Sequence, residues 1–253
     1  MTLTTLKLST QNRISTVTLH RPKVRNAINL KMLQELRLVF SELEKDDECH
    51  VVVLTGEGSV FCSGADLNEM LRATPKEQEG HADLSKDLSE TLKQMSTFSK
   101  PLVAAVNGPA IGGGVGLLCT ADITLCVEKA LFRFSEVHLG LVPAVISPFV
   151  TERIGKSNAR RYMLTGEPIS SKNAKDSGLV NEVVSKESFE ECLHSLLQHI
   201  LKGAGDALKE CKSLIDYVTS HDMDSSLVYA EKALNRVRET PEAKRRINKF
   251  LSS

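Results

Sequence analysis

Hydrophobic and polar positions along the chain follow two alternating patterns, short apolar runs and longer stretches with helical spacing. The apolar runs predict strands at residues 17–19, 51–54, 102–106, 122–127 and 132–134. Apolar side chains recur at helical spacing in two sets: Leu30, Leu33, Leu36, Phe40 and Leu43, and then Leu84, Leu88, Leu92 and Met95. Strands that alternate with helices predict an α/β fold built from layers.

The pattern changes in two places. Residues 72–80 are polar and weakly patterned, which predicts a mobile surface segment. From Glu187 onward the pattern is helical, and it ends near the basic run Lys244-Arg245-Arg246. The C-terminal part of the chain is therefore expected to be a helical region.

Composition narrows the class of protein. With 253 residues and 41% hydrophobic content, the chain can bury a substantial core. Lys plus Arg and Asp plus Glu both number 32, so the molecule projects no strong field toward nucleic acid or an acidic membrane. The N-terminus lacks a signal-peptide pattern, and no apolar run approaches the ~20 residues of a membrane helix. We expect a cytoplasmic protein that binds neither nucleic acid nor membranes.

The cysteines and histidines point to no metal site. The six cysteines, at positions 49, 62, 119, 126, 192 and 211, form no C-x-x-C pair and lie in or beside apolar runs. They are expected to be reduced, buried thiols. The seven histidines show no H-E-x-x-H spacing, and no G-x-S-x-G elbow of a serine hydrolase is present.

A glycine triplet is the first candidate for chemistry. Gly112-Gly113-Gly114 lies between the predicted strand at 102–106 and a helical pattern at 115–119. Glycines let the backbone approach a ligand closely, and a helix start supplies free N–H groups that can hold an oxyanion. The triplet is no dinucleotide fingerprint, because Leu117 breaks that spacing. A tight packing turn explains the triplet equally well.

Two further elements are weak when taken singly. The bend Phe61-Cys62-Ser63-Gly64-Ala65-Asp66-Leu67 has small residues that leave backbone N–H groups accessible, although an ordinary loop capping a helix through Asp66 also fits. Glu136 is flanked by apolar residues, and burial there would raise its pKa and suit it to proton transfer. The competing interpretation is a glutamate at a helix start beside Ser135, with His138 a structural ring.

The order and spacing of these three elements resemble the crotonase (enoyl-CoA hydratase/isomerase) superfamily, from about residue 17 to residue 184. The resemblance implies a spiral of β-β-α repeats followed by a helical C-terminal region. On this basis we expect a spiral core with the CoA-thioester site over residues 1–195. Residues 196–253 are expected to be a helical region used in trimerisation, giving a homotrimer or a dimer of trimers.

The resemblance also assigns the site. It places the two oxyanion-hole amides on Ala65 and Gly113 and the proton-transfer group on Glu136. The residues implied for binding the substrate and its coenzyme A are Lys23, Val24, Arg25, Ala27, Ala65, Asp66, Leu67, Asn68, Gly112 and Gly113. Lys23 and Arg25 could equally be solvated surface cations. No cofactor is implied beyond the coenzyme A of the substrate, and no metal.

The chain departs from the standard hydratase pattern in two places. That pattern has a first glutamate where this chain has Gly116, and its glycine-rich stretch is replaced here by Pro143-Ala144-Val145-Ile146-Ser147-Pro148. Three segments instead resemble bacterial methylglutaconyl-CoA and carboxygeranoyl-CoA hydratases of leucine and terpenoid catabolism. They are Gly-Gly-Gly-Val-Gly-Leu, Glu-Val-His-Leu-Gly-Leu-Val-Pro-Ala-Val-Ile-Ser-Pro and Ala-Arg-Arg-Tyr-Met-Leu-Thr-Gly-Glu. The expected function is therefore a lyase, an enoyl-CoA hydratase of the methylglutaconyl-CoA type.

Several alternatives stay open on the sequence. A substrate with a distal carboxylate would need a cation in the acyl pocket, for which Arg72 and Arg133 are candidates. A lone carboxylate also fits a Δ3,Δ2-enoyl-CoA isomerase, which shuttles a proton between two carbons, and a glutaconyl-type decarboxylase is a further option. A non-catalytic acyl-CoA or RNA-binding protein on the same fold is the alternative from another class, although the balanced charge disfavours RNA.

Overall fold

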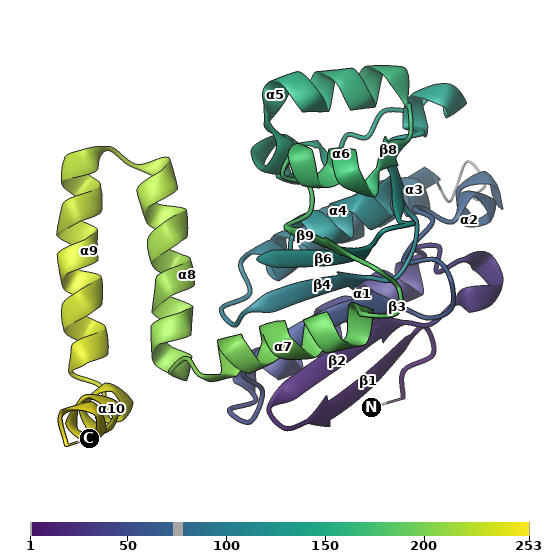
Figure 1. Ribbon diagram of the computed structural model, residues 1–253. Coiled ribbons are helices and arrows are strands. Elements are labelled where there is room, and N and C mark those ends of the chain that lie inside the picture. Colours follow the sequence, from purple (N-terminus) through teal and green to yellow (C-terminus); the bar gives the residue numbers. More distant parts are fainter. Residues whose placement is uncertain (1, 73–77, 253) are drawn as a thin grey trace.

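A six-stranded sheet forms the body of the molecule (Figure 1). The computed structural model describes residues 2–72 and 78–252, and side chains outside residues 70–83. In spatial order the strands are β1 (Leu6–Gln11), β2 (Ile14–Leu19), β3 (Val51–Gly56), β4 (Leu102–Val106), β6 (Ile123–Val127) and β9 (Glu182–Val184). In this sheet β1 and β2 pair antiparallel, and the other neighbouring strands pair parallel. Parallel strands are covered on both faces, which is why β3 and β4 are almost continuously apolar.

A second, smaller sheet is formed by the short strands that follow the long ones along the chain. It joins β5 (Ala110–Ile111), β7 (Leu131–Arg133) and β8 (Ile169–Ser170). Isolated bridges Cys62↔Ala110 and Ile28↔Ala65 extend this layer toward the N-terminal turns. A long strand, a short strand and a helix thus follow one another, as in β4, β5 and α4 (Gly113–Cys119). The expected spiral of β-β-α repeats is confirmed.

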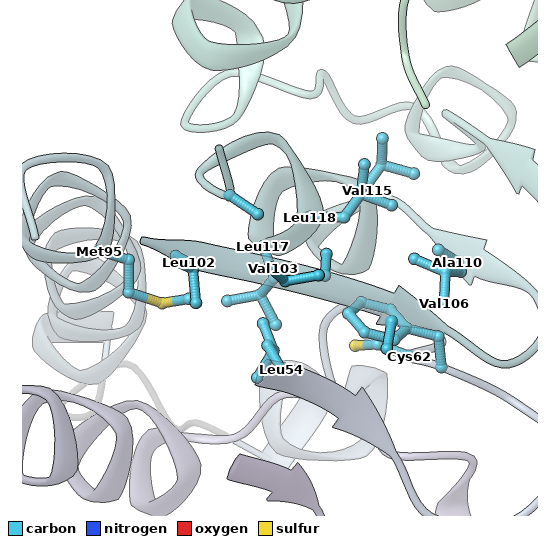
Figure 2. Packing of buried hydrophobic residues seen from close by; sticks show 14 of the residues in the cluster. Leu54, Cys62, Met95, Leu102, Val103, Val106, Ala110, Val115, Leu117 and Leu118 are labelled. Carbon is cyan, nitrogen blue, oxygen red and sulfur yellow. The ribbon is translucent and has the colours of Figure 1, made fainter. Parts of the chain in front are cut away.

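Helices enclose the sheets. Besides α4 they are α1 (Leu30–Lys45), α2 (Leu67–Arg72), α3 (Gln78–Ser96), α5 (Ser147–Thr165) and α6 (Ser171–Asp176), with 3-10 turns η1 (Pro22–Val24) and η2 (Glu136–Leu139). Helix α1 starts at Asn29, whose side chain accepts a hydrogen bond from the Met32 N–H. Figure 2 shows one packed cluster to which α3, α4, β3 and β4 contribute, with Met95, Leu117, Leu54 and Val103 among its members.

The chain ends in a helical arm. Helix α7 (Phe189–Leu201) lies on the sheet, and α8 (Gly205–Ser220), α9 (Met223–Arg238) and α10 (Pro241–Leu251) are set off from the body (Figure 1). The boundary expected between residues 195 and 196 falls inside α7. Its Phe189 and Leu197 are buried in the core cluster, and the next helix, α8, begins at Gly205. None of the described helices is long and apolar enough to span a membrane.

Most predicted elements are present, with local corrections. All five predicted strands overlap observed ones, and both helical stripes lie on α1 and α3. The segment 72–80, predicted to be a mobile surface segment, is helical at its described ends, and residues 73–77 lie outside the described residues. The cysteines are free thiols, but burial holds only for Cys49, Cys62 and Cys126. Cys119 and Cys192 are half-buried, and burial was wrong for Cys211, which is exposed on α8, a helix set off from the body.

Candidate active site

A cavity of about 330 Å³ gathers the three sequence elements. Ala65, Gly113 and Glu136 all line it, although they come from a loop, a helix start and a 3-10 turn far apart in the sequence. A site of this size is within the range of small-molecule sites. The cavity is therefore the candidate active site.

The Ala65 amide is aimed by its neighbours. The N–H of Ile28 donates to the Gly64 carbonyl at 2.7 Å, and the Asp66 N–H donates to the Ile28 carbonyl at 2.8 Å. Because adjacent peptide groups of extended backbone alternate in direction, the intervening Ala65 N–H faces away from Ile28. Gly64 is required here, since its φ is +88° and a Cβ would lie 2.9 Å from the carbonyl oxygen of Ile111.

The Gly113 amide lies opposite. Gly113 is the first residue of α4, where N–H groups have no partner within the helix and carry the positive end of its dipole. A Cβ built on Gly113 would lie 4.0 Å from the Ala65 nitrogen, and one built on Gly64 would lie 3.6 Å from the Gly113 nitrogen. Within the described part of the chain, neither N–H has a protein acceptor. Two unsatisfied donors therefore adjoin one space, which can hold a carbonyl oxygen that gains negative charge.

Glu136 supplies a carboxylate next to these donors. Its Oε1 lies 2.7 Å from the position a Cβ would take on Gly112, and its buried Oε2 has no hydrogen-bond partner among the described residues. Burial raises the pKa of Glu136 above its ordinary value. The residue does begin the turn η2, but Ser135 makes no side-chain cap bond there. A desolvated carboxyl with one oxygen unpaired, next to two free amides, suits proton transfer.

The position of Gly116 is closed by an apolar side chain. Gly116 lies one helical turn after Gly112 on α4, and a Cβ there would approach Cγ2 of Ile146 to 2.3 Å. Ile146 is buried and lines the cavity. In the described part of the lining, Glu136 is consequently the only carboxylate.

The wall beyond Glu136 is apolar. It is formed by residues of α3 and of the segment between η2 and α5: Leu84, Leu88, Leu141, Val142, Val145 and Ile146. Of the two cations considered for this wall, the side chain of Arg72 lies outside the described residues. Arg133 is not in the wall, because its guanidinium bonds to Gly166 and His138. The described lining thus contains neither lysine nor arginine.

The predicted coenzyme A loop lies beside the oxyanion segment. Lys23, Val24 and Arg25 are exposed on and after η1, and the Ser63 N–H donates to the Arg25 carbonyl at 3.0 Å. Neither Lys23 nor Arg25 has an ion-pair partner among the described side chains. Both cations are therefore available to phosphate groups.

The remaining predicted binding residues divide into two kinds. Leu67 and Asn68 are exposed, and Leu67 lines the cavity, whereas Ala27 is buried. The carboxylate of Asp66 is also buried and forms an ion pair with Arg21 at 3.0 Å. Its side chain therefore supports the segment instead of facing a substrate.

Sequence reasoning missed the residues that shape the loop. Arg21 donates to the Ala27 carbonyl at 2.6 Å in addition to pairing with Asp66. Asn26, fully buried with φ +55°, donates to the carbonyls of Val60 and Phe61. A buried asparagine in a basic loop gives no periodic signal, so only its contacts identify it.

Comparisons with known proteins identify the family. The model of the enoyl-CoA hydratase/isomerase family matches residues 9–251. The chain is 30% identical to the short-chain-enoyl-CoA hydratase of Clostridium acetobutylicum, over 99% of this chain and 96% of that one. It is 31% identical to the 2,3-dehydroadipyl-CoA hydratase of Escherichia coli, over 97% and 95% of the two chains.

A solved structure has the same fold. The enoyl-CoA hydratase/isomerase from Marinobacter aquaeolei superposes with a TM-score of 0.92 at 33% identity, covering 98% of this chain and 96% of that chain. The similarity in fold and in sequence extends over nearly the whole chain. The chain therefore belongs to the enoyl-CoA hydratase/isomerase family, with the crotonase fold.

Proposed function

We propose that this protein adds water to the double bond of an α,β-unsaturated acyl-CoA thioester, with Glu136 as the single proton-transfer group. The observation that carries the proposal is the meeting of two free amides, Ala65 and Gly113, with one desolvated carboxyl in one cavity. The hydratase names of several relatives support the same reaction.

The reaction follows from the charges that develop. Attack of water on Cβ moves electrons onto the thioester oxygen, where the two amides meet the new charge, each worth about 3–4 kcal/mol in the transition state. Glu136 takes a proton from the attacking water and returns one to Cα, which leaves a 3-hydroxyacyl thioester. A proton-transfer group of this kind contributes roughly 100- to 10,000-fold.

For the acyl group we propose the methylglutaconyl-CoA type, on the strength of the segments at 112–117, 136–148 and 159–167. The apolar wall of the cavity fits the branched carbon skeleton of such an acyl group. Because the described lining has no cation, the distal carboxylate would extend beyond that wall. Lys23 and Arg25 are the proposed contacts for the phosphates of coenzyme A.

The hydration assay tests the proposal directly. Purified protein is mixed with crotonyl-CoA and, separately, with 3-methylglutaconyl-CoA, and loss of the enoyl absorbance is followed. Turnover of either thioester supports the hydratase, and a preference for 3-methylglutaconyl-CoA supports the acyl assignment. Absence of turnover with both contradicts the proposed hydration.

A Δ3,Δ2-enoyl-CoA isomerase is the second candidate, because Ile146 leaves Glu136 as the only described carboxylate at the reacting carbons. Moving a proton between two carbons needs one such group. A 3-enoyl-CoA incubated in heavy water separates the two activities. The isomerase yields a conjugated, deuterated enoyl-CoA, whereas the hydratase leaves the 3-enoyl-CoA unchanged.

We also propose that the protein works as a homotrimer or dimer of trimers. Helix α9 carries an exposed apolar stripe of Met223, Leu227 and Leu234 at helical spacing, on an arm set off from the body. An apolar stripe on a projecting helix is typical of an interface between subunits. The closed, symmetric contact that a second copy provides would cover it.

A further inference from the structure

A charged side chain and a histidine lie behind the catalytic turn, outside the cavity. Arg133, at the end of β7, brings Nη2 to 3.0 Å from Nδ1 of His138, which belongs to η2. Nε of Arg133 donates to the Gly166 carbonyl at 2.6 Å, and Nε2 of His138 lies 2.9 Å from the Thr165 carbonyl oxygen. Two side chains thus fasten η2 to the C-terminal end of α5.

These contacts determine which ring nitrogen donates and which accepts. A guanidinium can only donate, so Nδ1 of His138 must accept, and a carbonyl can only accept, so Nε2 must carry the hydrogen. Both contacts are satisfied together when Nδ1 accepts and Nε2 donates. The residue is exposed, and its ring lies against Gly166, where a Cβ would be 2.7 Å from Nε2.

Arg133 also reaches the oxyanion turn through its backbone. Its carbonyl accepts the Gly112 N–H at 2.8 Å, within the β5–β7 pairing of Ile111 with Arg133. Gly112 immediately precedes the Gly113 donor. One residue therefore connects the turn that carries the oxyanion donor with the turn that carries Glu136.

Glu136 depends on such support. Its Oε2 has no hydrogen-bond partner among the described residues, so the position of the carboxyl is set by the backbone of η2. That turn is held at its end by Gly140, with φ +71°, and by the Leu141 N–H donating to the Glu136 carbonyl at 2.9 Å. Both features are local to η2, and neither fixes it relative to α4 or α5.

We propose that Arg133 and His138 form a positioning pair that fixes the Glu136 carboxyl relative to the amides of Ala65 and Gly113. Neither residue lines the cavity, so neither touches the substrate. The inference rests on the proposed role of Glu136 in proton transfer. A carboxyl displaced by about 1 Å loses on the order of 100-fold in rate while substrate binding persists.

The test compares replacements of His138. His138→Ala should lower kcat at least tenfold with KM, and the dissociation constant of a saturated acyl-CoA, changed less than twofold. His138→Asn keeps an acceptor near Nδ1 and His138→Gln keeps a donor near Nε2, so each should recover part of the loss. The control is His199→Ala on α7, where an exposed ring hydrogen-bonds to the Ser195 carbonyl, and kcat should not change.

Several results would contradict the proposed positioning role of Arg133 and His138. One is a kcat for His138→Ala within twofold of wild type. Another is a loss of kcat that parallels weaker acyl-CoA binding and a lower thermal midpoint, with no recovery in the Asn and Gln variants. Should wild type turn over neither 2-enoyl nor 3-enoyl thioesters, the proposed function fails separately. Crystal structures of wild type and His138→Ala then decide, and an unmoved Glu136 carboxyl rejects the pair.

Discussion

At the scale of single residues, the site is organised around groups left without partners. The amides of Ala65 and Gly113 and the Oε2 of Glu136 have no hydrogen-bond partner among the described residues. Buried polar groups usually find partners, because an unpaired one costs about 1–3 kcal/mol. Three such groups around one cavity mark a site that a substrate completes.

Replacing Glu136 by glutamine should separate chemistry from binding. Glu136→Gln keeps the shape of the side chain but cannot accept a proton, so kcat should fall roughly 100- to 10,000-fold. Binding of a saturated acyl-CoA should persist, and the thermal midpoint should rise because a desolvated charge is removed. Calorimetric titration and thermal unfolding measure both, and a variant that retains wild-type kcat would exclude Glu136 as the proton-transfer group.

The pH profile should report the same carboxyl. Burial raises the pKa of Glu136 above the ordinary 4.5. As a base it works only when ionised, so kcat should fall as pH decreases through this raised value, and the acidic limb should lie above pH 4.5. A profile of kcat between pH 4 and pH 8 measures the limb. A limb at or below the ordinary glutamate value would contradict the desolvated environment.

At the scale of elements, the contact between α4 and the start of α5 determines how many acids the site holds. Gly116 and Ile146 touch so closely that no side chain fits on α4 at this position. Gly112, one turn earlier, is approached instead by Glu136. The glycine at the start of α4 thus faces the Glu136 carboxyl, and the glycine one turn later faces a methyl group of Ile146.

Gly116→Ala tests this contact. Alanine normally stabilises a helix relative to glycine by roughly 0.5–1 kcal/mol. Here the added methyl would lie 2.3 Å from Cγ2 of Ile146, and such overpacking costs about 1–3 kcal/mol, so the variant should be less stable. Denaturant unfolding measures the change, and in an Ile146→Ala background Gly116→Ala should no longer destabilise the protein. A single variant as stable as wild type would show that α4 and α5 can separate freely.

The N-terminus is tied to α1 by a buried carboxylate. Burial alone raises the pKa of Glu35, but hydrogen bonds from the side chains and backbone of Thr5 and Thr4 outweigh it and lower the pKa to about 2. The folded pKa lies below the 4.5 of the unfolded chain, so the stabilisation is complete above pH 4.5 and disappears toward pH 2. About 3 kcal/mol corresponds to this shift.

Glu35→Gln should therefore lower the free energy of unfolding at pH 7 by about 2–3 kcal/mol. The difference from wild type should shrink as pH falls below 4.5. Glu42→Gln, an exposed glutamate on the same helix, is the matched control and should change stability by less than about 0.5 kcal/mol. Equal effects of the two variants would refute the special role of Glu35.

At the scale of the whole molecule, the cavity and the exposed apolar helix faces lie in different parts of the chain. The body contains every residue of the cavity, whereas α8, α9 and α10 are set off from it with apolar side chains exposed (Figure 1). A monomer in water rarely leaves so many apolar groups uncovered on one helical arm. The arm is therefore where assembly should be decided.

Sedimentation should give a trimer or a dimer of trimers for the wild type. Leu227→Glu combined with Leu234→Glu places charge on the apolar stripe of α9 and should shift the protein to smaller species. Asn235→Glu introduces the same charge one position further along α9, where the side chain is already polar and exposed, and should leave assembly intact. A wild type that sediments as a monomer would contradict the proposed assembly.

The sequence by itself determined the elements and the types of residue at the site. Strand runs such as 51–54 and the stripe of α1 carry periodic apolar patterns, and the glycine triplet and Glu136 stand beside them, so both were predictable. Only the tertiary structure decided what Arg133, Asp66 and Gly116 do. Asp66 and Gly116 meet Arg21 and Ile146 only when segments distant in the sequence pack together. Arg133 and His138 are near in the sequence, but their carbonyl partners, Gly166 and Thr165, become neighbours only when η2 packs against the end of α5. Periodicity reports which face of an element is buried, and it contains no information about which distant side chain that face meets.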